Sequence, residues 1–452
     1  MVITKEKINT ENKFVLAFEQ QKAQMDGGAY VLKVREDAMK DFLSRGIPGR
    51  KNEEYKYSNP VKLFQEEYVF QGLPVCTGFS AQEEDVYKKA SAELIPGLNP
   101  FIIVLYNGSF REELSDLSGL PKGVIVKSLK QAFEENPELI QNYFNTCADS
   151  AEDAFASLNT AFCSDGVFIY VPEVVKIEKA FHIINRVGPV INQLSPADDL
   201  LIMPRHLFVV EKDAEVKIVE SFDNYESERV LINSVTEVIV KEQARTHFYK
   251  LQNGADKSSQ ICGIHVKQYE NSHFDTNLMV LNGLWIRNNL RIEVAGKNCE
   301  TFLNGLFITN ESQHVDNHTL VDHQQPDCES RQLYKGILDG KSAGVFNGKI
   351  YVRKDAQKIN AYQSSKNILL SDDAAIYTKP QLEIYADDVK CSHGSSTGRI
   401  NEEALFYLRS RGIGTEAAKR LLLFAFVSDV LKTITIEPLR NHLDILLKEK
   451  LT

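Results

Sequence analysis

Paired cysteines, long apolar runs and basic blocks are all missing from this sequence. The seven cysteines are widely scattered and include no Cys-x-x-Cys pair, which argues against both a disulfide framework and a self-contained zinc site. The most apolar run, Leu421 to Val427, is far shorter than the ~20 residues that cross a bilayer. The first residues contain no apolar core typical of a signal peptide. We therefore expect a cytoplasmic protein with no membrane partner.

Negative charge outweighs positive charge, because 62 Asp and Glu against 52 Lys and Arg give a formal net charge of −10, and no long Lys/Arg run occurs. Nucleic-acid affinity rests largely on Lys and Arg against phosphates, so we expect no nucleic-acid partner. Two predicted helices that meet at a glycine turn near Gly412 could suggest a helix-turn-helix, but the second has an apolar centre. With 452 residues, 43% of them hydrophobic and 25% charged, the chain is typical of a globular protein of two or three units.

Nucleotide-binding motifs are absent as well. The stretch "DGKSAG" (Asp339 to Gly344) resembles a phosphate loop. That motif requires a glycine five residues before Gly340, but this position is Lys335, and the nearest glycine is Gly336. The surrounding sequence is β-rich rather than strand–loop–helix. No G-x-G-x-x-G occurs either. The chain itself is therefore not expected to bind ATP.

What is present divides the chain into three stretches. Residues 1–150 show mostly helical spacing of apolar residues. Residues 151–400 consist of short alternating β-rich segments with hardly a helical interval. Residues 401–452 return to helical spacing, with Asn401 as the expected N-cap. The apolar face around Leu421 to Val427 requires burial in a bundle or against a partner.

A weak repeat lies inside the β-rich stretch. Asn-Gly pairs begin at Asn282, Asn304 and Asn347, at intervals of 22 and 43 residues, which are close to one and two units of ~21 residues. A fixed period near 20 in β-rich sequence is typical of a β-solenoid. Three unrelated hairpins would give the same pairs, since Asn-Gly favours type I′ turns, but the unbroken β-rich stretch favours the solenoid.

The densest group of metal-type side chains lies in "QHVDNHTLVDHQQPDC". On a strand, His314, Asp316 and His318 share one face. They form either a metal site on an outer face or the polar side of a half-buried strand. Spacing alone does not decide, because any alternating strand places residues i, i+2 and i+4 together.

A second candidate is "KCSHGSSTG", from Lys390 to Gly398. Cys391 and His393 share a face if this is a strand, but two ligands rarely complete a metal shell. Further ligands would come from Asp387 and Asp388, from the His/Asp group, or from another chain. The alternative is a strand end followed by a Gly-Ser-Ser-Thr-Gly turn into the helix at Asn401.

Longer stretches carry a resemblance to a known family. Ser330 to Gly398, the following "NEEALFYLRSRGIGTEAAKRLLLFAF", "GIPGRKNEEYKYSNP" and "LNTAFCSDGVFIYVP" resemble the SufB/SufD family of iron–sulfur cluster assembly scaffolds. Tyr55 stands where tryptophan is usual, and Ser365 where asparagine is common. The chain is more similar to the SufD branch, because SufB typically has a cysteine-rich N-terminal segment and a His-Glu stretch where this chain has Cys391-Ser392-His393.

The resemblance implies a mainly β fold, with a right-handed parallel β-helix core between N- and C-terminal helical regions. It implies a non-catalytic scaffold subunit that acts with a SufB-like subunit and a SufC-like ATPase, which would account for the missing phosphate loop. The helical region 401–452 would dock the ATPase. The expected partner-binding residues there are Leu405, Phe406, Tyr407, Arg409 and Arg411.

The resemblance also places Cys391 and His393 at the SufB–SufD interface. There they would help ligate a transient iron–sulfur cluster shared with SufB residues, since imidazole and thiolate bind iron readily. The resemblance associates reduced flavin with the complex, and no feature of this sequence locates a flavin site. No cofactor is expected in the isolated chain, and an exposed strand edge is compatible with a homodimer.

Two other classes of function fit the residues alone. A stand-alone β-helix enzyme acting on polysaccharide would use Asp316, Asp322, Asp387 and Asp388 as surface carboxylates. Such an enzyme predicts a cleft with exposed aromatics, yet the chain has one tryptophan, Trp285. The other class is a homodimeric metal-binding or structural protein.

Overall fold

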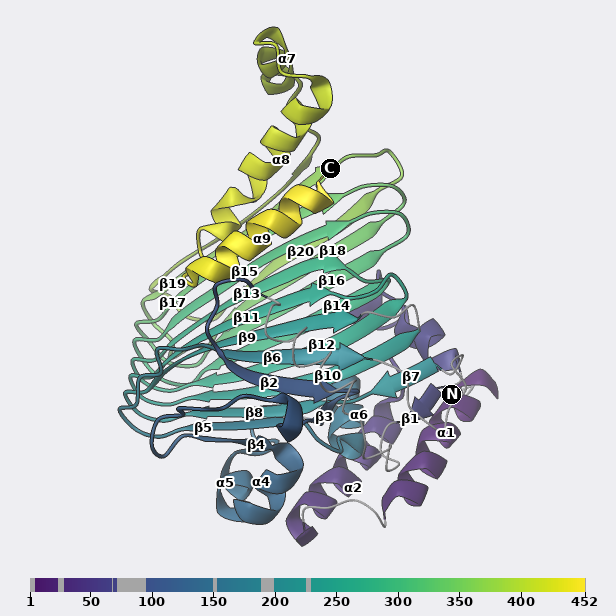
Figure 1. Cartoon of the computed structure of the whole chain (residues 1–452), viewed down its shortest axis with the longest axis vertical. Coiled ribbons are helices and arrows are strands. Elements are labelled where there is room, and N and C mark those ends of the chain that lie inside the picture. Colours follow the sequence, from purple (N-terminus) through teal and green to yellow (C-terminus); the bar gives the residue numbers. More distant parts are fainter. Residues whose placement is uncertain are drawn as a thin grey trace.

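Two facing sheets form the core of this chain. The computed structural model describes residues 5–22, 28–66, 68–70, 95–148, 153–187, 199–224 and 229–451; Cys76 lies outside these ranges. From β8 onward, successive strands belong to alternate sheets and pair in parallel with the strand two positions later (Figure 1). The fold is therefore a mainly β solenoid with helices at both ends, which confirms the predicted class. Among the described residues, no helix is long and apolar enough to span a bilayer.

The strands of each sheet follow in spatial order from the C-terminal end. The first sheet contains β20 (Ala375–Ile384), β18 (Ala343–Val352), β16 (His314–His323), β14 (Trp285–Val294), β12 (Ser258–Gln268), β10 (Val230–Val240), β8 (Arg205–Val210), β5 (Val167–Val171) and β4 (Ile125–Ser128), with β7 (Asp199–Ile202) and β1 (Tyr68–Phe70) at its side. The second contains β21 (Val389–Gly398), β19 (Ile359–Leu369), β17 (Glu329–Leu338), β15 (Glu300–Thr309), β13 (His273–Asn282), β11 (Arg245–Asn253), β9 (Glu215–Asn224), β6 (Phe181–Val187), β2 (Phe101–Tyr106) and β3 (Ser109–Phe110). Four of these strands, from β1 at Tyr68 to β4 at Ser128, lie within residues 1–150, where mostly helical structure was expected.

One corner of the solenoid reveals the true repeat. Six residues there have positive φ and are separated by 30, 28, 27, 29 and 31 residues: Asp213, Gln243, Asn271, Asn298, Asp327 and Lys358. Each donates its backbone N–H to a carbonyl of the following turn. Asn and Asp tolerate this left-handed conformation better than most residues, and four of the six are Asn or Asp. The predicted period of 21 or 22 residues is therefore wrong; one turn takes about 30 residues and two strands.

Two of the three Asn-Gly pairs that suggested the shorter period have a different role. Asn304-Gly305 lies inside β15 and Asn347-Gly348 inside β18, so neither is a turn. A Cβ added at Gly305 would lie 2.3 Å from the ring of Tyr334, and one at Gly348 would lie 2.0 Å from the side chain of Gln363. These glycines make room for large side chains from the neighbouring strands.

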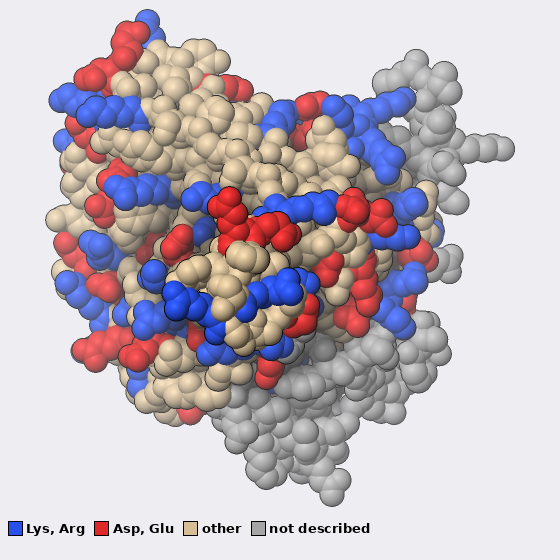
Figure 2. All heavy atoms as spheres, turned by 90° about the horizontal axis from the view of Figure 1, so that it is seen from above, with Lys and Arg blue, Asp and Glu red and all other residues tan. Residues whose placement is uncertain are grey.

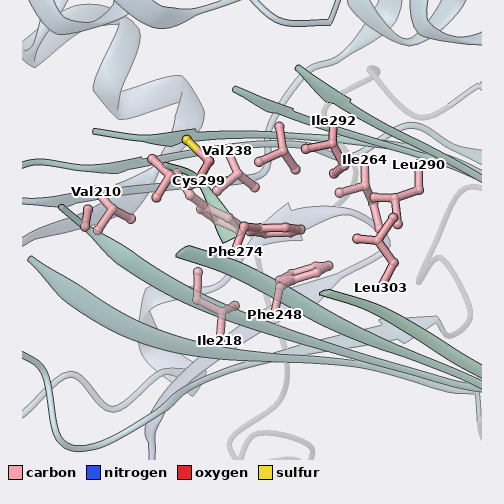
Figure 3. Packing of buried hydrophobic residues seen from close by; sticks show 14 of the residues in the cluster. Val210, Ile218, Val238, Phe248, Ile264, Phe274, Leu290, Ile292, Cys299 and Leu303 are labelled. Atoms are coloured by element: carbon pink, nitrogen blue, oxygen red, sulfur yellow. The ribbon is translucent and has the colours of Figure 1, made fainter. Parts of the chain in front are cut away.

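Alternate residues of each strand point between the sheets and form the core. Phe248 and Phe274 on the second sheet face Val238 and Ile264 on the first, in a cluster that runs the length of the solenoid (Figure 3). Such side chains contribute roughly 1.5–3 kcal/mol each when fully buried. The core therefore fixes which residues of every strand face outward.

Helices cover the outer faces of both sheets. Phenylalanines of α1 (Lys5–Lys22), α2 (Gly28–Arg45) and α6 (Ala154–Phe162) pack on the first sheet. Beside them lie α4 (Leu129–Glu135) and α5 (Pro137–Tyr143). The second sheet is covered by α8 (Thr415–Leu431) and α9 (Glu437–Lys450); Leu423 and Val427 of α8 are buried there, while Leu421 is 52% exposed. Helix α7 (Glu402–Ser410), capped by the Asn401 side chain, projects beyond the last strands (Figure 1).

Candidate functional site

The last strand, β21, carries the whole KCSHGSSTG motif on an open edge. It pairs with β19, and no other described residue pairs with it. Most of its side chains are exposed. The strand continues through Gly398, so the alternative of a Gly-Ser-Ser-Thr-Gly turn after a strand end is wrong.

The backbone of this edge is available to another strand. Asn360 donates its N–H back toward the preceding turn. In a parallel ladder, residues alternate in the direction of their N–H groups, so those of Cys391, His393, Ser395 and Thr397 point to the open edge. By contrast, the last strand of the first sheet, β20, contains Pro380, which has no N–H and is tolerated on edge strands. The β21 edge thus has an uninterrupted row of N–H donors, which the β20 edge lacks.

The side chains of Cys391 and His393 lie at the open end of the core. The strand register places Cys391 beside Ala361 and His393 beside Gln363. Cys391 is half-buried and packs against the core cluster. Burial raises the pKa of the Cys391 thiol, so the uncharged thiol is its resting form. His393 is exposed.

A series of buried, hydrogen-bonded polar side chains ends next to His393. The amide of Gln363 donates to Gln332 Oε1 at 3.1 Å, and Thr319 Oγ1 donates to the same oxygen at 2.7 Å. The side-chain amide oxygen of Gln363, Oε1, is buried and has no hydrogen-bond partner among the described residues. The core therefore presents polar groups, not an apolar cap, next to His393.

The described part of the chain supplies no third metal ligand to this pair. No group of three His, Cys, Asp or Glu donors there includes Cys391 or His393. Asp387 and Asp388 are exposed and precede the strand, and Ser395 is tied to Thr378 of β20 by a 3.0 Å hydrogen bond. One chain thus offers an imidazole and a thiol, which is half of a site.

A short N-terminal segment holds the last strands of the first sheet together. Glu53, in the 3-10 helix η1 (Glu53–Tyr55), forms an ion pair with Lys379 of β20 at 2.8 Å. Glu54 accepts from Asn347 of β18 and contacts His318 of β16, both at 3.1 Å. This segment bridges three strands behind the open end.

The predicted His/Asp group on β16 contacts the same N-terminal segment, which we call the N-terminal anchor. His314, Asp316 and His318 share the outer face, as alternation predicted. Asp316 is fully buried and pairs with Arg287 at 2.5 Å and with His318 at 2.9 Å. Burial alone would raise the pKa of Asp316, but the Arg287 guanidinium holds it well below its usual range. His314 contacts Ser58 at 2.7 Å, so all three side chains serve the contact with the N-terminal segment.

The carboxylates proposed for a polysaccharide enzyme do not converge. Asp322 forms two hydrogen bonds with Arg353, at 3.0 and 2.8 Å. It lies six residues along β16 from Asp316, which is ~20 Å in a strand. Asp387 and Asp388 are on an exposed corner. Asp316 is buried in its ion pair with Arg287, and Asp322 is held by Arg353, so neither is free to serve in the acid/base pair that cleaves glycosidic bonds.

The expected partner-binding residues lie on α7 and just after it. Phe406 and Tyr407 are 73% and 58% exposed. Arg411 lies over the Tyr407 ring at 5.4 Å, and Arg409 is exposed. Leu405 is buried, so it cannot contact a partner directly without movement. Seen from the α7 end, Lys/Arg and Asp/Glu side chains are intermixed (Figure 2).

One group of metal-type side chains was missed from the sequence. His247, His273 and Asp275 come together on the outer face of the second sheet. The spacing of His273 and Asp275, two residues apart on one strand, was a readable signal. His247 is in register with Asp275, and that pairing could not be read without the 28-residue turn.

Comparisons with known proteins find relatives of one kind along most of the chain. A profile described as the SUF system FeS cluster assembly SufBD core domain matches residues 193–426, and one described as the SufBD protein N-terminal region matches residues 8–183. An "Iron-sulfur cluster assembly SufBD family protein" of Synechocystis is 29% identical over 405 residues, covering 88% of this chain and 86% of that protein. "Iron-sulfur cluster assembly protein SufD" of Escherichia coli is 28% identical, covering 89% of each chain. "Protein ABCI7, chloroplastic" of Arabidopsis thaliana is 28% identical, covering 91% and 84%.

Proposed function

Because this chain belongs to the SufBD family of SUF-system iron–sulfur cluster assembly proteins, we propose that it is a SufD-type, non-catalytic scaffold subunit. It works with a SufB-like subunit and a SufC-like ATPase, and a nascent cluster is built where it meets the SufB-like subunit. The observation that carries this proposal is the open β21 edge, which presents Cys391 and His393 beside an unpaired row of backbone groups.

The edge supports a strand-to-strand contact with the SufB-like subunit. A partner strand added to β21 would continue the second sheet across the interface, with main-chain hydrogen bonds along its length. The N-terminal segment stiffens the end of the solenoid through Glu53 and Glu54, so the edge is held ready for pairing. A second copy of this chain is the competing occupant of the edge.

The two side chains are suited to holding a cluster that must leave again. Neutral imidazole is a ligand as it stands, whereas the Cys391 thiol must lose its proton when it binds iron. With one imidazole and one thiolate from this chain, the remaining ligands come from the SufB-like subunit. The iron–sulfur cluster is the cargo of the scaffold, and a shell divided between two subunits allows release when they move apart.

The projecting α7 supports docking of the ATPase. Phe406 and Tyr407 expose aromatic rings on its surface, and Arg409 and Arg411 add positive charge. Aromatic and arginine side chains are enriched where interfaces concentrate their binding energy. Leu405 acts from beneath, by holding α7 in place. Nucleotide hydrolysis then belongs to the partner, which agrees with the missing phosphate loop.

Co-expression tests this proposal. The chain is produced with SufB-like and SufC-like partners, purified without oxygen, and assayed for co-purification, bound iron and the visible iron–sulfur chromophore. We expect His393→Ala and Cys391→Ser to preserve the complex but to lower the cluster content, and Ser395→Ala, on the same face of the same strand, to leave it unchanged.

Each outcome has a separate meaning. A chain that co-purifies with neither partner contradicts the scaffold proposal. Equal cluster content in wild type and His393→Ala contradicts the role of His393 alone. A stable homodimer that excludes the SufB-like partner assigns the β21 edge to a second copy.

A further inference from the structure

The strongest unexplained group lies on the outer face of the second sheet, away from the β21 edge. His247 on β11 is the register partner of Asp275 on β13, and His273 precedes Asp275 by two residues on the same strand. Residues two apart on a strand share a face, so all three side chains project from one patch. Each is 9–11% exposed, which shields the group yet leaves it open to ions.

The donor atoms of this group converge on one point. One donor atom from each residue lies within 4.8 Å of the other two. His247 Nδ1 contacts Asp275 Oδ2, and His273 Nε2 contacts the same oxygen at 3.0 Å. Two imidazole nitrogens and one carboxylate oxygen are the donor set of many zinc sites and of the facial triad that binds ferrous iron.

The far sides of both imidazoles also match a metal site. His273 Nδ1 contacts Glu300 Oε2 at 3.0 Å, and His247 Nε2 lies 3.9 Å from Glu215 Oε1. Metal-bound histidines almost always give their second ring nitrogen to a carboxylate, a carbonyl or water, which orients the ring and raises its basicity. Here His273 has a carboxylate at hydrogen-bond distance in that position, whereas Glu215 lies near His247 but beyond a direct hydrogen bond.

From this geometry we propose that His247, His273 and Asp275 bind one divalent transition-metal ion, such as Zn²⁺ or Fe²⁺. His247 Nδ1, His273 Nε2 and a carboxylate oxygen of Asp275 are the ligands, and water or an outside ligand completes the shell. Glu300 orients His273. This inference goes beyond the proposed scaffold function, because it concerns another face of the solenoid and needs no partner chain.

The surroundings hold these ligands rigidly. The site is built on the regular strands β11 and β13, not on loops, and it adjoins the turn between α8 and α9. Thr433 Oγ1 lies 2.6 Å from Asn277 Oδ1, and Tyr249 contacts Thr435 at 2.9 Å. Asn277 and Tyr249 each follow a proposed ligand by two residues. Preorganised donors of this kind favour binding without rearrangement of the backbone.

Metal titration of the purified full-length chain tests the proposal. The protein is stripped with a chelator and titrated with Zn²⁺ by calorimetry, with Co²⁺ by visible absorption, and with Fe²⁺ without oxygen as a competitor. All titrations use the Cys391→Ser/His393→Ala background, so that the other candidate pair contributes nothing. We expect one ion per chain, loss of binding in Asp275→Asn and His273→Gln, and weakening of about tenfold or more in Glu300→Gln.

Three results would overturn the site. They are no binding of any of the three ions by the Cys391→Ser/His393→Ala chain, unchanged affinity when Asp275→Asn is added to that chain, and unchanged affinity when His273→Gln is added. Each would leave the group as a network of hydrogen bonds. Thermal unfolding of every variant identifies one that has lost its fold, and Glu300→Gln, whose side chain is half exposed, keeps the test valid if a ligand variant does not fold.

Discussion

The buried ion pair between Arg287 and Asp316 gives a quantitative test of the N-terminal anchor. Both side chains are nearly or fully buried, and the guanidinium lies 3.9 Å from the Tyr55 ring centroid. Removing one partner of a buried pair costs about 3–5 kcal/mol, because the other charge remains buried without compensation. Arg287 keeps the Glu54 carbonyl and Asn289 as acceptors, both at 2.9 Å. We therefore expect Asp316→Asn to lower the free energy of unfolding by about 3 kcal/mol.

Urea unfolding at neutral pH measures this loss, and tryptophan fluorescence reports on the same place. Trp285 is the single tryptophan, and it stacks on His314 beside the ion pair. Asp322→Asn is the matched control on the same strand. Its partner Arg353 is half exposed, so the guanidinium that loses its partner is solvated, and we expect this substitution to cost about 1 kcal/mol or less. An Asp316→Asn protein within about 1 kcal/mol of wild type would refute the reasoning.

Three further predictions follow from the core, its histidines and the projecting helix. Gly305→Ala places a methyl group 2.3 Å from Tyr334 and should cost about 1–3 kcal/mol in urea unfolding, with Tyr334→Leu relieving part of the loss; additive losses would contradict the packing. Burial lowers the pKa of three core histidines from 6.5, to about 3 for His182 and about 4 for His265 and His323. Their neutral form is favoured by folding, so this stability is complete above pH 6.5 and falls by about 2 kcal/mol per histidine between pH 6.5 and 5. His323→Gln should remove one third of that fall, and unfolding that is independent of pH over this range would contradict it. Phe406→Ala should weaken capture of the SufC-like ATPase without changing the melting temperature, because its ring is 73% exposed; unchanged capture would exclude it from the docking surface.

The alternation of side chains made several features predictable. Period-two patterning predicted the β-rich core and placed His314, Asp316 and His318 on one face, where they lie. It could not reveal that this face is covered by Glu54 and Tyr55, because those residues are more than 230 positions away in the chain from the side chains they contact. A contact of that kind is fixed by the fold and leaves no local pattern.

The number of residues in one turn of the solenoid was the main feature that could not be predicted from the sequence. Asn-Gly was interpreted as a turn, yet at Gly305 and Gly348 it marks a place where a neighbouring side chain needs room. The real signal was the positive-φ corner, which includes Gln243 and Lys358 as well as Asn and Asp. Without the correct register, the convergence of His247 with His273 and Asp275 could not be seen either.

Blocking the β21 edge tests the central claim most directly. Ser395→Pro removes a backbone N–H that points to the open edge, which an edge strand tolerates, while Ser395→Ala removes the same hydroxyl and keeps the N–H. Both variants are co-expressed with the SufB-like and SufC-like partners, and complex recovery is measured by co-purification, with the melting temperature of each isolated chain as the check on folding. We predict that Ser395→Pro loses the SufB-like subunit but retains the ATPase, and that Ser395→Ala retains both. A folded Ser395→Pro chain that recovers the complete complex would contradict strand pairing at this edge.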